Sequence, residues 1–467
     1  MPPGPNIVVV MADQLRRQAF SHAGDPNVQT PHIDALAADG VRCSNANTTY
    51  PICVPNRFAF VTGEYAHTRH AHHGWRMSPA ERTFAHDLAD AGYQTAWVGK
   101  WHLADVGRDR PVPPHLQGGF EHWRGFELKN APFETSYYVD DDPTPHPIEG
   151  YQTDGLTDLA IDFFDERDED RPFCLVLSVE PPHPPFTAPE KYLDRVADRE
   201  LELRPNVPYD DPDALPGQYD AWGDLESATD GLYERHRYFG DVLLNEMRAY
   251  YAMVENLDDN VGRLRTALAD RGLADETALF LTADHGEMMG SHGHMAKQRP
   301  YEESVGVPLI GHQPGAIEGG RVIEPPVCTE DWFPTISSIA GGEAPNAPGT
   351  DLTPLFTGER TELDRDGVLL EFAREVRSSM PFFEDTWRGF RTDQYKYTVL
   401  GGEPWQLFDL AADPYEQNNL VDSATDRAAD LHGTLRDRLI ETNDDYVLDP
   451  AFGHAGLNQP SSPFDER

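Results

Sequence analysis

The chain has very few lysines and cysteines. Of its 38 cationic residues 33 are arginine, and the five lysines are Lys100, Lys129, Lys191, Lys297 and Lys396. The four cysteines form no CxxC pair, and so few in 467 residues exclude a disulfide scaffold. No segment approaches the roughly 20 apolar residues of a membrane span, and nothing basic precedes a leader-like apolar run. We therefore expect a cytoplasmic protein without a membrane span.

Positive charge is scarce as a whole. Aspartate and glutamate number 80, which gives a formal net charge of -42, and the acidic residues are spread along the chain. At 1 M salt the Debye length is about 3 Å, so carboxylates at this density no longer repel each other strongly. We interpret the composition as adaptation to a high-salt organism. The alternative is an acidic protein that binds basic partners, and a nucleic acid is not an expected partner.

The order of apolar and helical segments predicts the fold class. Short apolar runs alternate with longer helical patterns, of which the stripe from Met247 to Leu268 is the clearest. This alternation is typical of an α/β fold with a large, mostly parallel central sheet sandwiched by helices. The apolar runs are Asn6–Ala12, Gln94–Gly99, Phe173–Val179, Thr277–Ala283 and Val307–Gly311.

The last quarter of the chain has a different pattern. Strand-like pieces between residues 366 and 410, followed by a helix with Leu431, Leu435 and Leu439 on one face, predict a smaller C-terminal subdomain of antiparallel sheet plus helix. We place the catalytic α/β domain at 1–350 and the C-terminal subdomain at 351–467. The Pro- and Asp-rich segment 198–223 reads as a surface insertion or lid, and 453–467 as a tail.

Polar residues follow the apolar runs at the points where strands would end. Asp13 ends the first run, and the segment 99–102 (GKWH) follows the second. His183 follows the third run, and the segment 284–287 (DHGE) follows the fourth. Ligands of open α/β sheets bind outside the carboxyl ends of the strands, so these pieces are expected at one edge. Lys100 and Lys297, two of only five lysines, would join them there.

A cysteine stands just before a predicted helix in the segment TTYPICVPNRFAFVTGEY, residues 48–65. Pro55 suits the first turn of a helix, so Cys53 would lie where backbone N–H groups point outward and favour anions. Arg57 adds a fixed positive charge one turn later. We expect a lowered pKa for the Cys53 thiol, which would make it a nucleophile.

The same segment contains a family signature. CVPNR fits the Cys-X-Pro-X-Arg pattern, and the chain resembles the type I, formylglycine-dependent sulfatases of the alkaline phosphatase superfamily over roughly residues 6 to 445. The ordered segments that carry the resemblance are NIVVVMADQ, TPHIDALAADGV, CVPNR, VGKWHL, PPHPPF, YYAMVENLDDNVGRL, FLTADHGE and RTDQYKY…LFDLAADPYEQNNL.

The resemblance implies a nucleophile made from Cys53. A formylglycine-generating enzyme would oxidise Cys53 to formylglycine, whose hydrated form would attack the sulfur of a small-molecule or saccharide sulfate ester. Arg57 and Lys100 would stabilise the negative charge on the hydrated aldehyde and the sulfate.

Three further residues would move protons in this scheme. His183 and Lys297 would protonate the leaving alcohol, and His102 would take a proton from the remaining hydroxyl so that sulfate is expelled.

The resemblance also implies a divalent metal. Its ligands would be Asp13, Gln14, Asp284 and His285, together with the converted Cys53. Calcium is the expected ion and manganese the alternative, because an imidazole ligand also suits manganese.

Two other functions stay open. The Gln14 and His285 pair looks more like the choline-sulfatase and phosphonate-monoester-hydrolase branches, so a phosphonate monoester or phosphodiester hydrolase is one alternative. A non-catalytic protein that binds a sulfated ligand is the other. No pattern in the sequence names the substrate or an oligomeric state.

Overall fold

A ten-stranded sheet forms the centre of the computed structural model, which describes residues 4–208, 240–342, 347–373 and 386–448. The strand order is β11-β2-β10-β9-β1-β8-β4-β5-β6-β7. The five strands from β9 to β5 are parallel, whereas β10, β6 and β7 pair antiparallel. The strands are β1 (Asn6–Ala12), β2 (Val41–Cys43), β4 (Gln94–Lys100), β5 (His122–Phe126), β6 (Ser136–Val139), β7 (His146–Pro147), β8 (Phe173–Val179), β9 (Thr277–Ala283), β10 (Leu309–His312) and β11 (Arg321–Ile323).

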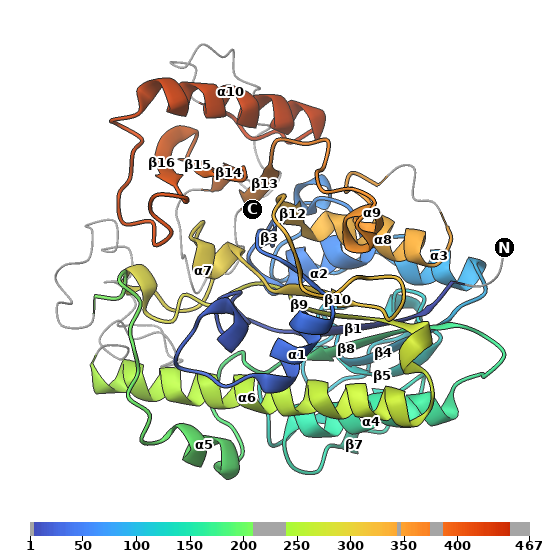
Figure 1. Cartoon of the computed structure of the whole chain (residues 1–467). Coiled ribbons are helices and arrows are strands. Elements are labelled where there is room, and N and C mark those ends of the chain that lie inside the picture. Colours follow the sequence, from blue (N-terminus) through green and yellow to red (C-terminus); the bar gives the residue numbers. More distant parts are fainter. Residues whose placement is uncertain (1–3, 209–239, 343–346, 374–385, 449–467) are drawn as a thin grey trace, which may run out of the picture.

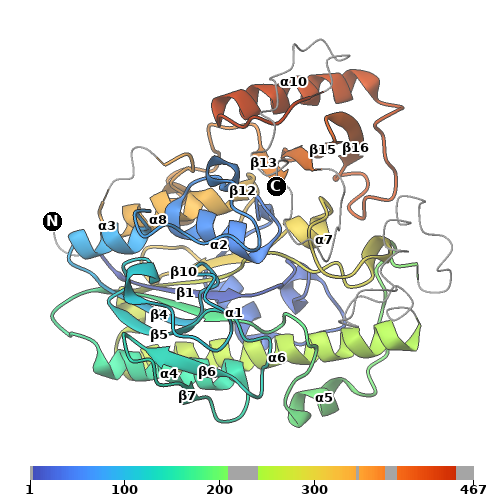
Figure 2. The ribbon, with the colours of Figure 1, turned by 180° about the vertical axis from the view of Figure 1, so that it is seen from behind.

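Helices cover both faces of this sheet, which confirms the predicted fold class. One face carries α1, α4 and α6, with α5 packed on α6, and the opposite face carries α2, α3, α8 and α9 (Figures 1 and 2). The helices are α1 (Pro31–Asp39), α2 (Cys53–Thr62), α3 (Phe84–Asp90), α4 (Gln152–Glu166), α5 (Glu190–Val196), α6 (Asp241–Asp270), α7 (Glu302–Val305), α8 (Trp332–Ile339) and α9 (Thr353–Thr357).

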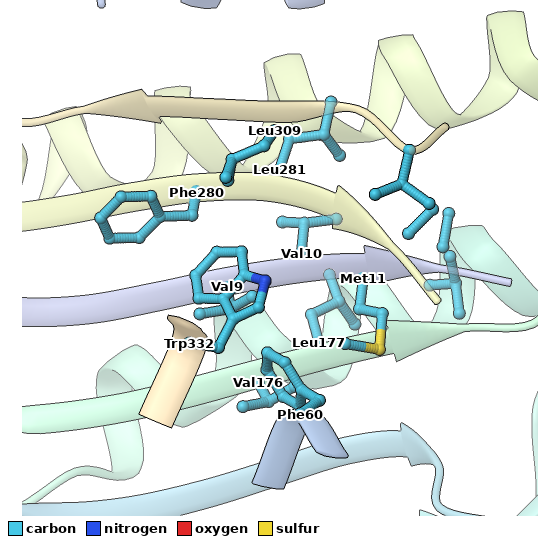
Figure 3. Close-up of a cluster of buried hydrophobic side chains, with 14 of the residues drawn as sticks. Val9, Val10, Met11, Phe60, Val176, Leu177, Phe280, Leu281, Leu309 and Trp332 are labelled. Carbon is cyan, nitrogen blue, oxygen red and sulfur yellow. The ribbon is translucent and has the colours of Figure 1, made fainter. Parts of the chain in front are cut away.

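The central strands are buried on both faces, which explains their continuous apolar sequences. Strands β8 and β9 have seven residues each, and all of these residues are buried. Phe60 of α2 and Trp332 of α8 pack together on one side of the sheet, with ring centroids 5.5 Å apart, and Trp332 also lies 5.6 Å from Phe280 of β9 (Figure 3). This packing fixes α2, and with it the predicted nucleophile, against the sheet.

A separate four-stranded antiparallel sheet follows, as predicted. Its strands are β13 (Val368–Phe372), β14 (Trp387–Arg391), β15 (Tyr395–Leu400) and β16 (Glu403–Asp409), and α10 (Thr425–Glu441) packs on it. The stripe of Leu431, Leu435 and Leu439 lies in one cluster with Phe390 and Tyr397 of the sheet. Leu370, Phe372 and Trp387, however, belong to the large core. The boundary near residue 350 stays a prediction.

Some predicted features fall partly outside the described residues. The insertion predicted at 198–223 is described only as far as 208, and the tail predicted at 453–467 lies outside. A short parallel pair of β3 (Ala46–Asn47) and β12 (Val327–Cys328) completes the strands. Among the helices of the described ranges, none has the length and apolar character needed to cross a membrane.

Candidate active site

The carboxyl ends of the central strands place the predicted site residues at one edge. Asp13 follows β1, and its backbone N–H donates to Val179 O at 3.0 Å; Asp284 follows β9, and its N–H donates to Ala12 O at 3.2 Å. Lys100 is the last residue of β4. The strands thus deliver two carboxylates and one ammonium to neighbouring positions.

Gly99 allows β4 to approach β8 closely just before Lys100. Its φ is +106°, and a Cβ at this position would lie 2.0 Å from Ser178 O. A larger residue would therefore push Lys100 away from the sheet edge.

Cys53 is the first residue of α2 and is buried against these groups. Its Sγ lies 3.2 Å from His285 Nε2, 3.6 Å from Asp13 Oδ1 and 3.7 Å from Lys297 Nζ. The structure therefore brings residues from four separate parts of the chain around one sulfur atom.

The lowered pKa expected for the Cys53 thiol is wrong. Burial raises the pKa of Cys53 to about 12, and the negative charge of Asp13 adds to the increase. Desolvation of the thiolate outweighs the nearby lysines and the helix N-terminus. The unmodified thiol is neutral at pH 7 and is not a ready nucleophile.

Cations surround the two carboxylates. Lys100 Nζ lies 2.5 Å from Asp13 Oδ2, and Arg57 Nη2 lies 3.5 Å from the same oxygen. Arg57 Nε donates to Asp284 Oδ2 at 3.0 Å. Burial alone would raise the pKa of Asp13, but Lys100 and the other neighbouring cations hold it well below its usual value. Asp13 is therefore ionised, and Lys100 and Arg57 balance its negative charge.

The donor set fits a divalent cation. Ligand atoms of Asp13, Cys53, Asp284 and His285 all lie within 4.8 Å of one another, and the four residues are buried. His285 Nδ1 lies 3.0 Å from Gly286 O, which leaves the lone pair on Nε2. Burial lowers the pKa of His285 to about 4, so the imidazole is neutral. Carboxylate oxygens and a neutral imidazole nitrogen are suitable metal ligands.

The Gln14 amide is oriented by partners on both sides. Its φ is +64°, and its backbone N–H donates to Asp284 Oδ1 at 3.1 Å. The side-chain Nε2 donates to Glu287 Oε2, and the Oε1 accepts from Lys297 Nζ at 2.6 Å. The amide oxygen thus faces Lys297, which also lies 3.7 Å from the Cys53 sulfur, and Gln14 can serve as an oxygen ligand.

Glu287 contacts the candidate site in a way that the sequence did not reveal. Its Oε1 accepts backbone N–H groups of Met289 at 2.9 Å and Ala296 at 2.6 Å, so it also closes the loop that leads to Lys297. It belongs to the DHGE segment, but no sequence feature indicates that its carboxylate would orient an amide from another strand.

His102 and His183 lie at the border of this network. His102 has a φ of +62°, and burial and the charge of Lys100 lower its pKa well below 6.5. Burial and Lys297 lower the pKa of His183, whose Nδ1 lies 2.8 Å from Pro184 O. Both imidazoles are neutral at pH 7 in this structure.

A cavity of about 260 Å³ opens beside His102. Trp75 lines it and is held by an edge-on contact with Phe58, with ring centroids 5.1 Å apart. The other lining residues are Val54, His73, Gly74, Asp105, Gly107, Arg108, Glu127 and Leu128. An aromatic ring with polar groups around it suits an organic ligand that carries hydroxyl groups.

Comparison with known proteins gives the family. The sulfatase family model matches residues 5–342, and the model of the N-sulphoglucosamine sulphohydrolase C-terminal region matches residues 290–445. The chain belongs to the sulfatase family. It is 31% identical to an ulvan-active sulfatase of Formosa agariphila, over 99% of this chain and 87% of that protein.

Solved structures agree with this membership. One solved structure, in complex with its substrate D-glucosamine-2-N,6-O-disulfate, has a TM-score of 0.80 at 26% identity, and the match covers 95% of this chain and 99% of that chain. The phosphonate monoester hydrolase of Agrobacterium radiobacter has a TM-score of 0.73 at 25% identity, with 97% and 98% coverage. The predicted sulfuric ester hydrolase of the alkaline phosphatase superfamily is confirmed. The family generally uses a divalent metal and a formylglycine.

Proposed function

We propose that this sulfatase hydrolyses the sulfate ester of a saccharide with a formylglycine made from Cys53 and a bound divalent cation. The observation that carries the proposal is the contact network of Asp13, Cys53, Lys100 and Asp284 at one sheet edge. Saccharide substrates are supported by the ulvan-active relative and by the glucosamine disulfate bound in the similar structure.

Asp13, Gln14, Asp284 and His285 would hold the cation beside the converted residue 53. A bound cation would polarise a sulfate oxygen as a Lewis acid. Two carboxylates and one amide oxygen favour Ca²⁺, and the neutral imidazole of His285 makes Mn²⁺ the alternative.

Arg57 and Lys100 provide fixed positive charge where the sulfate would bind. Both side chains are buried, and their contacts with Asp13 and Asp284 hold them in place before substrate enters. In a site that excludes water, such preorganised charge stabilises the transition state strongly. Arg57 Nη1 also donates to Ser178 Oγ at 2.9 Å, which fixes the plane of the guanidinium group.

Lys297 and His183 would supply the proton that the departing alcohol oxygen requires. Lys297 Nζ lies 3.7 Å from Cys53 Sγ, within reach of a group bound to residue 53. A sulfate beside His183 would raise the pKa of its imidazole, because negative charge favours the protonated form. His102 is neutral and able to accept the proton released when sulfate is expelled. The net reaction consumes one water and yields the alcohol, sulfate and a proton.

The cavity beside His102 would hold the alcohol part of the substrate. A sugar ring can stack on Trp75, while Asp105 and Arg108 offer an acceptor and donors for its substituents. The proposal also includes a formylglycine-generating enzyme, which would convert Cys53 during maturation. It further includes a cytoplasmic location and a high-salt source organism.

A phosphonate monoester or phosphodiester hydrolase is the second candidate. The Gln14 and His285 pair and the fold shared with the phosphonate monoester hydrolase favour it. The centre would bind either tetrahedral oxyanion.

Parallel assays on an aryl sulfate and a phenyl phosphonate ester separate the two candidates. We expect a second-order rate constant at least tenfold larger for the sulfate. A larger constant for the phosphonate would reject the main proposal. The variant Cys53→Ala controls for contaminating activity, and it should be inactive on both compounds.

Mass spectrometry of the peptide that contains Cys53 tests the nucleophile. An aldehyde that reacts with a hydrazide supports the proposed conversion. A fully intact thiol in native material would exclude the proposed conversion. If that material is also inactive, binding of a sulfated ligand without turnover would explain the result.

A further inference from the structure

A second polar cavity lies away from the catalytic residues. Its volume is about 320 Å³, and it is built from the segment after Gln14, the start of β10, the end of β2 and the C-terminal sheet. The charged residues that line it are Arg17, Arg42, Arg204, Arg391 and Glu302. Helix α7, which carries Glu302, lies between the large sheet and the C-terminal sheet (Figure 1).

The charge of this cavity is opposite to that of the molecule. Four arginines and one glutamate line it, whereas the whole chain has 80 acidic and 38 cationic residues. His22 also lines the cavity, but burial lowers the pKa of its imidazole, so it contributes no positive charge at pH 7.

Two of the arginines are used to attach the C-terminal sheet. Arg17 Nη2 lies 2.6 Å from Glu302 Oε2, and Arg391 Nε lies 3.1 Å from Glu302 Oε1. Lys396 lies 3.1 Å from the same glutamate and 2.5 Å from Glu416. The carboxylate of Glu302 on the cavity wall thus forms ion pairs with two guanidinium groups and with the ammonium group of Lys396.

The other two arginines leave donors for a ligand. Arg204 Nε lies 3.1 Å from Glu303 Oε1, and its guanidinium carbon lies 4.9 Å from the centre of the Tyr415 ring, which holds the group flat. Arg42 pairs with β10 and β11 through its backbone, but its side chain makes no hydrogen bond or ion pair with any residue that the structure describes. Four guanidinium groups against the carboxylates of Glu302 and Glu303 leave a surplus of two positive charges.

We propose that this cavity binds an oxyanion of the sulfate or phosphate type. Guanidinium groups present paired N–H donors that match the oxygens of such anions, and a half-buried arginine without a counter-ion gains most from one. The site uses none of the catalytic residues, so it stands independently of the proposed mechanism. Helix α7 adjoins both places, because Gly286 N–H, next to His285, donates to Ser304 O at 2.9 Å.

The same chemistry has two sources. The anion is either free inorganic sulfate, the product of the family's reaction, or a sulfate group on a more distant unit of a longer saccharide. Two titrations with the full-length protein distinguish them, one with inorganic sulfate and one with a heparin-derived sulfated tetrasaccharide. Both are made at a constant ionic strength of about 0.15 M, because salt screens these interactions.

The variants Arg42→Gln and Arg204→Gln remove one cavity cation each. Arg360→Gln is the matched control, because Arg360 is exposed and lies outside the cavity. The catalytic centre is the same in all of these proteins, so differences between them report on the cavity. We expect each cavity variant to bind at least one of the two probes about tenfold more weakly than the control does, as expected for the loss of one charge-assisted hydrogen bond.

Each outcome has a defined meaning. Weaker binding of inorganic sulfate identifies a site for the free anion, and weaker binding of the tetrasaccharide alone identifies a site for a saccharide sulfate. Equal affinities for the cavity variants and the control in both titrations would overturn the proposal. Thermal unfolding of each variant confirms that it is folded, and two separate variants protect the test from the failure of one.

Discussion

At the scale of single residues, the centre depends on how one amide is turned. Glutamine can present either its oxygen or its nitrogen, and only the oxygen is a metal ligand. Glu287 accepts from Gln14 Nε2, so Oε1 must point the other way, toward Lys297. Glu287 would therefore position the Gln14 oxygen for the proposed metal site.

Replacement of Glu287 by glutamine is expected to weaken divalent metal binding about 10- to 100-fold. The new side chain can offer an N–H to Gln14 and so allow the amide to flip, and loss of such outer partners typically has this effect on affinity. Equilibrium dialysis with Ca²⁺ and with Mn²⁺ measures the change directly, without an activity assay.

Glu276→Gln is the control for this measurement. Glu276 is exposed and precedes β9, so the same change of charge occurs away from the centre. If the Glu287 variant binds the metal as tightly as the control does, Gln14 keeps its orientation without Glu287, and the assigned role is wrong.

The sequence predicted which residues lie close together, but it did not predict their pKa values. Asp13, Lys100 and Asp284 each stand at a strand end, so the topology of a parallel sheet predicts their proximity. The pKa of Cys53 depends on burial, which a local helix argument does not include. The role of Glu287 depends on a contact between residues 273 positions apart.

At the scale of secondary-structure elements, a buried histidine links the segment after α2 to the C-terminal sheet. His67 lies in the short 3-10 helix Ala66–Arg69 after α2, and its Nδ1 is 2.5 Å from Glu371 Oε2 of β13. Its Nε2 lies 3.1 Å from Thr442 O, just after α10. Burial alone would lower the pKa of His67, but Glu371 and Asp444 raise it to about 9. The charged imidazole thus stabilises the docking of the C-terminal subdomain.

The stability of the fold should therefore decrease in mildly alkaline solution. His67 is protonated in the folded state up to about pH 9 but only up to about pH 6.5 in the unfolded chain. Its contribution, about 3 kcal/mol, is complete below pH 6.5 and is lost as the pH rises to 9. Denaturant unfolding between pH 6 and pH 9.5 measures this loss.

His67→Asn should remove most of the pH dependence in this range. The exposed His115 provides the matched control, because His115→Asn leaves the buried pair intact. A wild-type free energy of unfolding that stays constant from pH 6.5 to 9 would contradict the assigned role.

The elements themselves differ in how far the sequence predicts them. Continuous apolar runs give β1, β8 and β9 with their observed ends, because strands buried on both faces carry no alternation that could blur the pattern. The last run begins two residues before β10 starts, and its antiparallel direction depends on a pairing that no local pattern encodes. Short edge strands such as β7 and β11 hold only two or three residues, too few for a periodic signal.

At the scale of the whole molecule, charge is divided unevenly. The net charge is -42, yet Lys100 and Arg57 are buried in the centre, and four arginines line the second cavity. Most acidic residues that the structure describes are not buried, so solvent-facing carboxylates repel one another at low ionic strength. Long-range attraction of an anionic substrate cannot come from such a surface, so recognition must be local.

Salt should stabilise this protein through screening, and most steeply at low concentration. The Debye length falls from about 30 Å at 0.01 M to about 10 Å at 0.1 M and about 3 Å at 1 M, so most repulsion is screened before 1 M. We expect the thermal unfolding midpoint to rise with KCl and then to level off. An uncharged excluded osmolyte, sucrose, is the control, because it favours burial without screening and should give no such plateau. A midpoint that is flat or falls between 0.05 and 0.5 M KCl would show that the carboxylates do not limit stability, and the high-salt interpretation of the composition would fail.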